Sequence, residues 1–217
     1  MSRIVVVGGH GRTGILIVQK LLAEKHEVVA TIRNPRHMAD LVKLGAETVL
    51  IDLDKTDFDE IVYAFKGADA VIFAAGSAAG ETSELDRKGT LRTVRAAEKA
   101  RVKRYLSISA IGASTGLSTR SMNEEMKDYY KQKRAAAKHI TGSSLDWTIL
   151  EPGELIDEAG AGKVTLSEDA LEETFVTRDD VAAVAAALVT EKTAAGHVYQ
   201  LTRGKTPIAA AVKAALG

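Results

Sequence analysis

The sequence predicts an α/β protein with a doubly wound parallel sheet, and three observations indicate this fold. Short apolar runs of strand length alternate with segments of helical period along most of the chain. The apolar runs are nearly continuous, which is typical of parallel strands that are covered on both faces. The first run leads into a glycine-rich turn that opens a helix. Strict β-α alternation implies right-handed crossovers and therefore a sheet with helices on both sides.

The expected elements follow one another in chain order. We expect strands at Ile4–Val7, Glu27–Ile32, Thr48–Ile51, Ala70–Ala74, Arg104–Ser109 and Trp147–Leu150. We expect helices at Thr13–Glu24, Met38–Leu44, Phe58–Phe65, Ser83–Ala100 and Glu124–Thr141. This is the Rossmann pattern, for which the strand order is 3-2-1-4-5-6 and the ligand lies at the switch point beside the first strand.

The alternation loosens after Pro152. The later elements expected are a helix at Arg178–Thr190, a strand at His197–Leu201 and a tail helix at Ile208–Leu216. This part is too short for a core of its own, so we expect a single domain over residues 1–217. Residues 152–217 would form a C-terminal extension that shapes the substrate side of the cleft. The acidic run Glu168–Glu173 is interpreted as a solvated loop.

Composition excludes several classes of function. The chain has 217 residues, 46% of them hydrophobic, and its 29 basic residues balance its 29 acidic ones. A zero net charge gives no long-range attraction to nucleic acid or to an anionic membrane. The absence of cysteine excludes disulfides, zinc-thiolate sites and cysteine nucleophiles, and the five histidines show no metal-ligand spacing. No apolar run is long enough to span a bilayer, so we expect a cytoplasmic protein.

The glycine-rich turn lies within Val5–Gly14 and satisfies both G-x-x-G-x-x-G and G-x-G-x-x-G. Such a turn exposes backbone N–H groups at a helix N-terminus, where the helix dipole also favours a phosphate. An ordinary strand-to-helix turn is the alternative, but the flanking strand and helix favour a dinucleotide site. The residues expected at the cofactor are Gly8, Gly11, Arg12, Thr13 and Gly14.

Arg33 ends the second strand at the place where NAD-preferring sites usually carry an acid. A guanidinium pairs well with a phosphate, so Arg33 would bind the 2′-phosphate of NADP. Arg12 could assist from the glycine loop. Either arginine could instead be a solvated surface residue, but together they favour NADP over NAD.

Two further segments end strands on the expected cofactor side. Asp52 and Leu53 close the third strand, where a carboxylate can accept a hydrogen bond from the adenine amino group. Ala74, Ala75 and Gly76 end the fourth strand, where small residues allow close approach of the backbone to the adenine ribose. Plain turns would use the same residue types, so both assignments remain open.

A candidate reactive centre follows the fifth strand. Tyr129 and Lys133 are four residues apart and therefore share one helix face. A lysine cation stabilises phenolate, which suits proton donation to a carbonyl oxygen during hydride transfer. Ser109 could hydrogen-bond the same oxygen. Tyr130 and Arg134 have the same spacing, so a surface helix remains an alternative.

A set of motifs carries a resemblance to a known family. The motifs are Gly8–Gly14, Arg33–Pro35, Asp52–Leu53, Val102–Tyr105, Ser107–Ser109, Tyr129–Ala136, Ser144–Gly153 and Thr177–Ala182. With them the chain resembles the atypical, NAD(P)-binding branch of the short-chain dehydrogenase/reductase superfamily. Relatives in that branch include flavin/biliverdin-IXβ reductases, NmrA-like regulators and small bacterial sugar-epimerase-like proteins.

The resemblance implies roles for five residues. Lys133 would bond the nicotinamide ribose and tune Tyr129, which would be the proton donor. Ser109 would orient the acceptor, and Pro152 and Gly153 would flank the nicotinamide. These roles predict an NADP(H)-dependent oxidoreductase that acts on a small carbonyl, quinone or flavin-like acceptor.

The sequence also departs from the family pattern. Many relatives have arginine before the Pro-Gly pair, whereas this chain has Glu151, and Glu154 follows. Two acids at the cleft mouth would disfavour an anionic substrate. Some members of the branch bind cofactor and perform no known chemistry, so two alternatives stay open: a cofactor-sensing regulator without turnover, and a sugar-nucleotide epimerase or dehydratase. The latter usually needs a larger C-terminal domain than the roughly 65 residues that follow Pro152.

Overall fold

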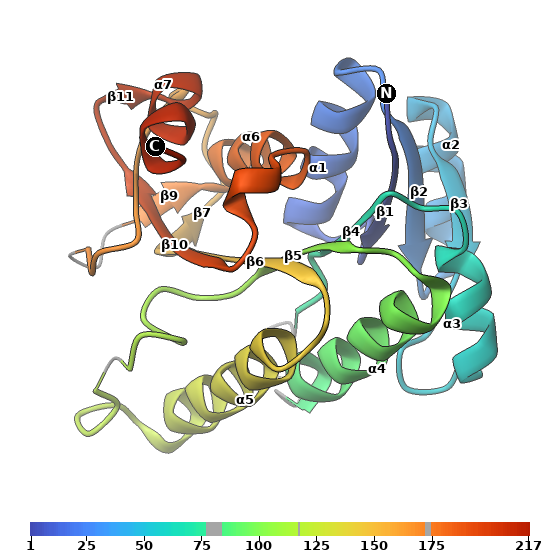
Figure 1. The fold of residues 1–217 in the computed structure, drawn as a ribbon, viewed down its shortest axis with the longest axis horizontal. Coiled ribbons are helices and arrows are strands. Elements are labelled where there is room, and N and C mark those ends of the chain that lie inside the picture. Colours follow the sequence, from blue (N-terminus) through green and yellow to red (C-terminus); the bar gives the residue numbers. More distant parts are fainter. Residues whose placement is uncertain (77–83, 117, 172–174) are drawn as a thin grey trace.

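A computed structural model describes residues 1–76, 84–116, 118–171 and 175–217. Its nine-stranded sheet has helices on both faces (Figure 1). Within these ranges no helix has the length and apolar character needed to cross a membrane. The mixed α/β class and the central parallel sheet that the sequence predicts are therefore confirmed.

The sheet is parallel except at one edge. Its parallel strands are β1 (Arg3–Val7), β2 (Glu27–Ile32), β3 (Glu47–Leu50), β4 (Ala70–Phe73), β5 (Arg104–Ile108), β6 (Asp146–Pro152) and β10 (His197–Arg203). Two antiparallel strands, β8 (Lys163–Ser167) and β11 (Thr206–Pro207), extend the sheet beyond β10. The order β3-β2-β1-β4-β5-β6 confirms the expected topology. A separate parallel pair joins β7 (Glu154–Ile156) to β9 (Phe175–Thr177).

The helices alternate with the strands as expected. They are α1 (Arg12–Ala23), α2 (Met38–Leu44), α3 (Phe58–Phe65), α4 (Glu84–Ala100), α5 (Glu124–Thr141), α6 (Arg178–Val189) and α7 (Ile208–Ala215). Short 3₁₀ turns, η1 (Pro35–His37) and η2 (Lys192–Ala194), were not expected. Asn123 caps α5 by accepting from the Met126 N–H at 2.9 Å, and Thr177 caps α6 by accepting from the Asp180 N–H at 3.0 Å.

Most predicted boundaries of helices and strands lie within two residues of the observed ones. Ser83, the expected first residue of α4, lies outside the described residues. Of the acidic run 168–173, Glu168 and Asp169 are exposed, in keeping with a solvated loop, whereas residues 172 and 173 lie outside the described part. The short strands β7, β8, β9 and β11 in the C-terminal extension were not predicted.

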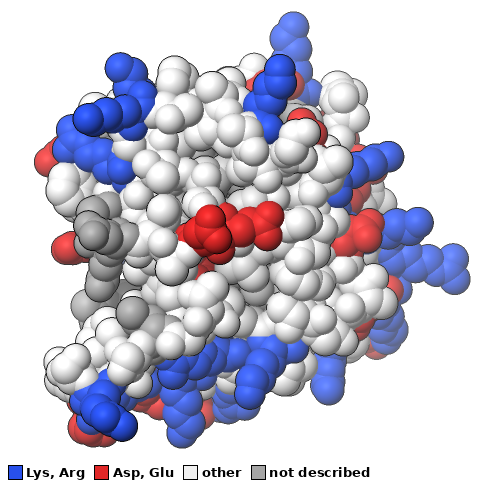
Figure 2. Space-filling model, turned by 60° about the vertical axis from the view of Figure 1, so that its left-hand side comes forward, with Lys and Arg blue, Asp and Glu red and all other residues white. Residues whose placement is uncertain are grey.

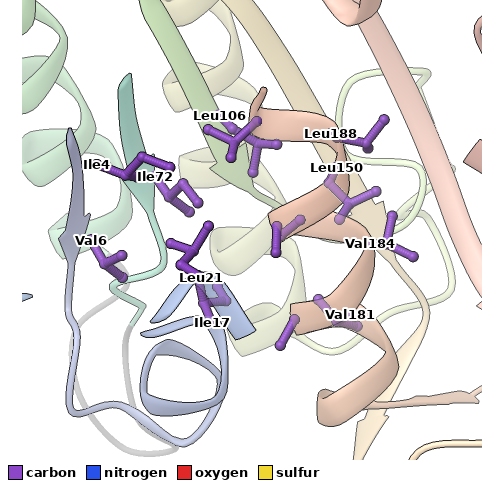
Figure 3. Packing of buried hydrophobic residues seen from close by; sticks show 14 of the residues in the cluster. Ile4, Val6, Ile17, Leu21, Ile72, Leu106, Leu150, Val181, Val184 and Leu188 are labelled. Atoms are coloured by element: carbon purple, nitrogen blue, oxygen red, sulfur yellow. The ribbon is translucent and has the colours of Figure 1, made fainter. Parts of the chain in front are cut away.

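The core has two layers, one on each face of the sheet. Ile4 and Val6 of β1 face the layer built with α1 and α6, and Val5 and Val7 face the layer with α3, α4 and α5. Figure 3 shows side chains of the first layer from β1, β4, β5 and β6 meeting those of α1 and α6. Successive side chains in a strand point to opposite faces, so a strand covered on both sides must be apolar at each position.

Arg104, at the start of β5, fixes the far end of α6. Its guanidinium donates to the Val189 and Leu188 carbonyls at 3.1 and 2.9 Å, and to the Asp146 carbonyl at 2.7 Å. The first two bonds reach carbonyls in the last turn of α6, where the Leu188 carbonyl also accepts from the Glu191 N–H at 3.2 Å. Burial lowers the pKa of Arg104 to about 10, in part offset by Asp146 and Tyr199. The opposite end of α6 begins at Arg178, which lines a cavity at the carboxyl ends of the parallel strands.

Candidate functional site

A cavity of about 550 Å³ lies beyond the carboxyl ends of β1, β2, β4 and β5. This is the switch point, because β4 and β2 lie on opposite sides of β1. The predicted residues that line the cavity are Gly8, Gly11, Arg12, Thr13, Arg33, Asp52, Leu53, Ala74, Ala75, Gly76, Ser109, Tyr129 and Lys133. Three predicted residues, Gly14, Pro152 and Gly153, lie outside this lining.

The glycine loop is shaped by close backbone contacts. Gly8 has a φ of 80°, and a Cβ there would lie 2.8 Å from Ala75 Cα. A Cβ on Gly14 would lie 2.1 Å from the Gly8 carbonyl oxygen, so Gly14 is required for packing of the turn rather than for contact with a ligand. Gly11 precedes α1 and provides no side-chain cap. The first N–H groups of α1 are thus left for an anion, and the cradle fits a dinucleotide pyrophosphate.

The adenosine end of the cavity is formed by the segments that follow β2 and β3. Arg33 is exposed at the end of β2 and lines the cavity. Asp52 also lines it, but its Oδ1 accepts from the Asp54 N–H at 3.0 Å, which makes it part of a local turn as well. Both readings of Asp52 from the sequence are therefore compatible with its position.

Two histidines at this end were not expected to meet. The rings of His10 and His37 are stacked with centroids 3.8 Å apart, and His10 Nε2 lies 3.1 Å from Asp40 Oδ2. Both rings line the cavity. The available signal was topological, since the loops that follow adjacent parallel strands emerge side by side.

Arg12 lines the cavity and is held there by an ion pair. Its Nη1 pairs with Asp157 Oδ2 at 2.9 Å, and Asp157 follows β7, which leaves the sheet after β6. That Arg12 assists Arg33 at a 2′-phosphate stays a prediction, since both arginines line the same cavity. Asp157 also pairs with Arg178, which the sequence reasoning missed.

The reactive end of the cavity contains a buried ion pair. Lys133 Nζ lies 2.8 Å from Asp86 Oδ1, and only 8% and 2% of the two side chains are exposed. The same nitrogen lies 5.5 Å from the centre of the Tyr129 ring. Burial acts to lower the pKa of Lys133, but Tyr129 and Asp86 outweigh it, so this pKa is raised. Ser109 lines the same cavity, so all three of the predicted Ser, Tyr and Lys residues face it.

The two tyrosines of equal spacing have different surroundings. Tyr130 is buried, and its hydroxyl donates to the Ile111 carbonyl at 3.2 Å, so it anchors the loop after β5. Tyr129 and Lys133 line the cavity, whereas Tyr130 and Arg134 do not. The geometry thus distinguishes two pairs that the sequence spacing left equivalent.

Asp86 is the residue of this group that sequence reasoning missed. It lies on the buried face of α4 with Gly89, Thr90 and Thr93, at helical spacing. Its Oδ2 is buried and has no hydrogen-bond partner among the residues that the structure describes. An acid on an otherwise small and buried helix face was the available signal, because buried carboxylates are normally paired.

Glu151 is not a residue of the cleft mouth, which corrects that expectation. It is 0% exposed, and its Oε1 accepts from the Ser114 N–H at 2.6 Å. Burial raises the pKa of Glu151, against the opposing effect of the hydrogen bonds from Ser114. Glu151 therefore holds the loop after β5, and of the two acids Glu154 alone is exposed.

The surface charges agree with the balanced composition. On the face shown in Figure 2, basic side chains lie in separate groups around the edges, and an acidic group lies near the middle. This face presents no continuous basic track of the kind that a nucleic-acid backbone requires. Across the described ranges, no group of three or more His, Asp or Glu side chains is arranged to hold a metal ion.

Comparisons with known proteins agree with this geometry. The family described as NAD(P)H-binding matches residues 8–192. The chain is 36% identical over 216 residues to the uncharacterized sugar epimerase YhfK of Bacillus subtilis (strain 168), covering 97% of this chain and 99% of that protein. Among solved structures it is similar to a putative NAD-dependent epimerase/dehydratase from Bacillus halodurans, with 34% identity, a TM-score of 0.90, and 99% and 100% of the two chains covered. It is also similar to ChuY, an anaerobillin reductase from Escherichia coli O157:H7, with 25% identity, a TM-score of 0.82, and 93% and 97% covered.

Proposed function

The chain belongs to the NAD(P)H-binding family, as its resemblance to the atypical short-chain dehydrogenase/reductases implies, and we propose that it is an NADP(H)-dependent oxidoreductase. The acceptor is a small carbonyl, quinone or flavin-like molecule. One observation carries this proposal. The cavity that starts at the glycine loop ends at Ser109, Tyr129 and the buried Lys133–Asp86 pair. A reductase among the similar structures supports it.

The cofactor residues of the proposal follow the cavity from end to end. The N–H groups of Arg12 and Thr13 bind the pyrophosphate, whereas the Gly11 N–H donates to the Gly8 carbonyl at 2.9 Å and shapes the loop. Arg33 binds the 2′-phosphate that distinguishes NADP. The adenine and its ribose lie against Asp52, Leu53 and the segment Ala74–Gly76. Pro152 and Gly153 lie outside the cavity lining, so their place beside the nicotinamide rests on the family resemblance alone. NADPH, when bound, supplies the hydride.

The protein's own contribution is proton transfer and positioning. Tyr129 donates the proton to the acceptor oxygen, and Ser109 hydrogen-bonds that oxygen. Lys133 bonds the nicotinamide ribose and acts on Tyr129. Because Asp86 holds Lys133 Nζ at 2.8 Å, it fixes the position of the ammonium and offsets its charge. Asp86 is thus a positioning residue in this proposal.

The test is an NADPH-oxidation screen against ketones, quinones and flavins. Tyr129→Phe should lower the rate of ketone reduction by about 10²- to 10⁴-fold, the usual contribution of a positioned acid. Tyr63→Phe, which alters an exposed tyrosine on α3, is the matched control. A flavin acceptor needs only the cofactor and a shaped pocket, so its reduction should change little.

Two results would contradict parts of the proposal. Unaltered ketone reduction by Tyr129→Phe would remove the acid role of Tyr129. Tight NADP binding without oxidation by any acceptor would favour the cofactor-sensing regulator instead.

A second candidate is a sugar-nucleotide epimerase or dehydratase. The names of two similar proteins, a sugar epimerase and an epimerase/dehydratase, favour it. Such a reaction returns the hydride to its substrate, so it consumes no net NADPH. Incubation with UDP-hexoses and a trace of NAD(P)⁺, followed by chromatography, should then yield a new sugar nucleotide that Tyr129→Phe fails to form.

A further inference from the structure

Two arginines from different helices share one carboxylate at the β7 end of the cavity. Arg12 is the first residue of α1 and Arg178 is the first residue of α6. Their Nη1 atoms lie 2.9 and 2.8 Å from the two oxygens of Asp157. Both arginines line the cavity, whereas Asp157 is on the loop that follows β7. The carboxylate therefore bridges two cations that belong to the cavity wall.

The three side chains differ in how firmly they are held. Arg178 has only 10% of its side chain exposed, and its Nη1 also donates to the Leu155 carbonyl at 3.1 Å. Arg12 and Asp157 are 72% and 60% exposed. A buried guanidinium such as that of Arg178 needs an anion beside it. The Asp157 carboxylate that fills this role is exposed, and exposed ion pairs are weak. Asp157 can therefore be displaced while Arg178 stays in place.

The acids nearest to this group on α6 are engaged elsewhere. Asp179 pairs with Lys20 at 2.8 Å, and Asp180 accepts from the N–H groups of Ala161 and Gly162 at 3.0 and 2.8 Å. Within the bridge itself, two guanidinium charges face one carboxylate. The N-termini of α1 and α6 add to the positive potential at the same place. A ligand anion entering here meets an excess of positive charge.

We propose that Arg12 and Arg178 form an anion site for a phosphate or carboxylate group of a bound ligand, and that Asp157 occupies the site as an internal substitute before the ligand arrives. The anion is the pyrophosphate of the cofactor or a carboxylate of the substrate. The identity of the ligand rests on the proposed function, whereas the site itself rests on the side-chain geometry. With Glu151 buried away from the cleft mouth, an anionic substrate is compatible with this end of the cavity.

The first experiment removes the internal competitor. Asp157→Asn keeps the shape of the side chain and removes its charge, and Glu158→Gln makes the same charge change one residue later. Calorimetric titration with inorganic pyrophosphate should show affinity about two- to fivefold higher for Asp157→Asn than for wild type, in keeping with the strength of an exposed ion pair. Glu158→Gln should bind like wild type.

Further titrations of the same proteins distinguish the two sources of the anion. If the cofactor supplies it, Asp157→Asn binds NADP⁺ more tightly but binds adenosine 2′-monophosphate unchanged, because the latter has no phosphate at its 5′ position. If the substrate supplies it, NADP⁺-saturated Asp157→Asn binds benzoate more tightly, with no gain for the neutral benzamide. Arg12→Gln changes an exposed side chain. It should lower the affinity for whichever ligand, NADP⁺ or benzoate, binds more tightly to Asp157→Asn. Arg178→Gln should weaken it by about tenfold or more, the strength of a lost charge-assisted pair, provided that its thermal melting matches wild type.

The inference is overturned if Asp157→Asn raises the affinity for none of these anions, or if Glu158→Gln raises it equally. The proposed oxidoreductase fails separately, on the absence of NADPH oxidation. Because inorganic pyrophosphate needs no turnover, the anion site can be supported even where the reductase activity is not found.

Discussion

Asp86→Asn tests whether the buried ion pair stabilises the reactive end of the cavity. The substitution keeps the side-chain size but removes the negative charge that lies 2.8 Å from Lys133 Nζ. Both side chains are almost fully withdrawn from water, so solvent screening does not weaken the pair as it would at the surface. Removal of one partner of such a pair costs about 3–5 kcal/mol. Because an asparagine oxygen can still accept from Lys133, we expect about 3 kcal/mol of lost stability at pH 7.

The pH dependence of the stability tests the same ion pair in a second, independent way. In the wild type the pKa of Lys133 is raised, so its stabilising contribution is complete below the ordinary lysine pKa and is lost as the pH rises through the folded value. Without Asp86, burial should dominate and lower the pKa of Lys133 in the folded state. The charged Lys133 then destabilises the folded state at neutral pH, and this destabilisation decreases as the lysine deprotonates. The deficit of Asp86→Asn should therefore be smaller at pH 10 than at pH 7.

Urea unfolding followed by circular dichroism measures both quantities. Glu84→Gln is the matched control, because Glu84 starts the same helix but its ion pairs with Lys88 and Arg87 are exposed, and it should change stability little. The double variant Asp86→Asn/Lys133→Met should recover stability, since it leaves no buried charge. Wild-type stability of Asp86→Asn at pH 7, or a deficit that grows with pH, would refute the reasoning.

Three other substitutions probe cofactor choice and the framework around the site. Arg33→Asp should lower NADP affinity by about tenfold or more while NAD affinity changes little, because a charge-assisted phosphate contact is lost; equal losses by calorimetry would count against Arg33. Glu151 has a raised pKa, so wild-type stability should fall as the pH rises from the ordinary carboxyl range through the folded value; thermal melts of Glu151→Gln should lack that fall, and parallel curves would contradict it. Arg104→Met should destabilise the protein by about 2–4 kcal/mol, because buried carbonyls at the end of α6 lose the guanidinium as a donor. Hydrogen exchange should be faster at the C-terminal end of α6, and unchanged exchange there would mean that Arg104 does not hold this end.

The parallel strands were predictable because a strand that is buried on both faces has apolar residues at consecutive positions. Val5 and Val7 face one core layer and Ile4 and Val6 the other, so the run is continuous and easy to recognise. Strand β8 lies near the sheet edge, where exposed Lys163 adjoins buried Val164, and such a short polar run carries little signal.

The candidate site was predictable where its residues share one local element. The spacing of Tyr129 and Lys133 follows from helix geometry, and the glycine loop follows from its turn. The partners across elements were not predictable in this way. Asp86 meets Lys133 only because α4 packs against α5, and Arg12 meets Asp157 only because the loop after β7 reaches the start of α1. Local spacing contains no information on such pairings, which depend on tertiary packing.

The position of α6 against α1 has a consequence for how the protein is made. The apolar stripe of Ile17 and Leu21 is covered by residues of α6, which the ribosome adds only after most of the sheet has been synthesised (Figure 3). Until then a nascent chain carries a bare hydrophobic groove on one side, and β6 lacks β10 as its neighbour. Assembly of the first layer must therefore wait for the last part of the polypeptide, which makes stalled or shortened translation products natural clients of chaperones.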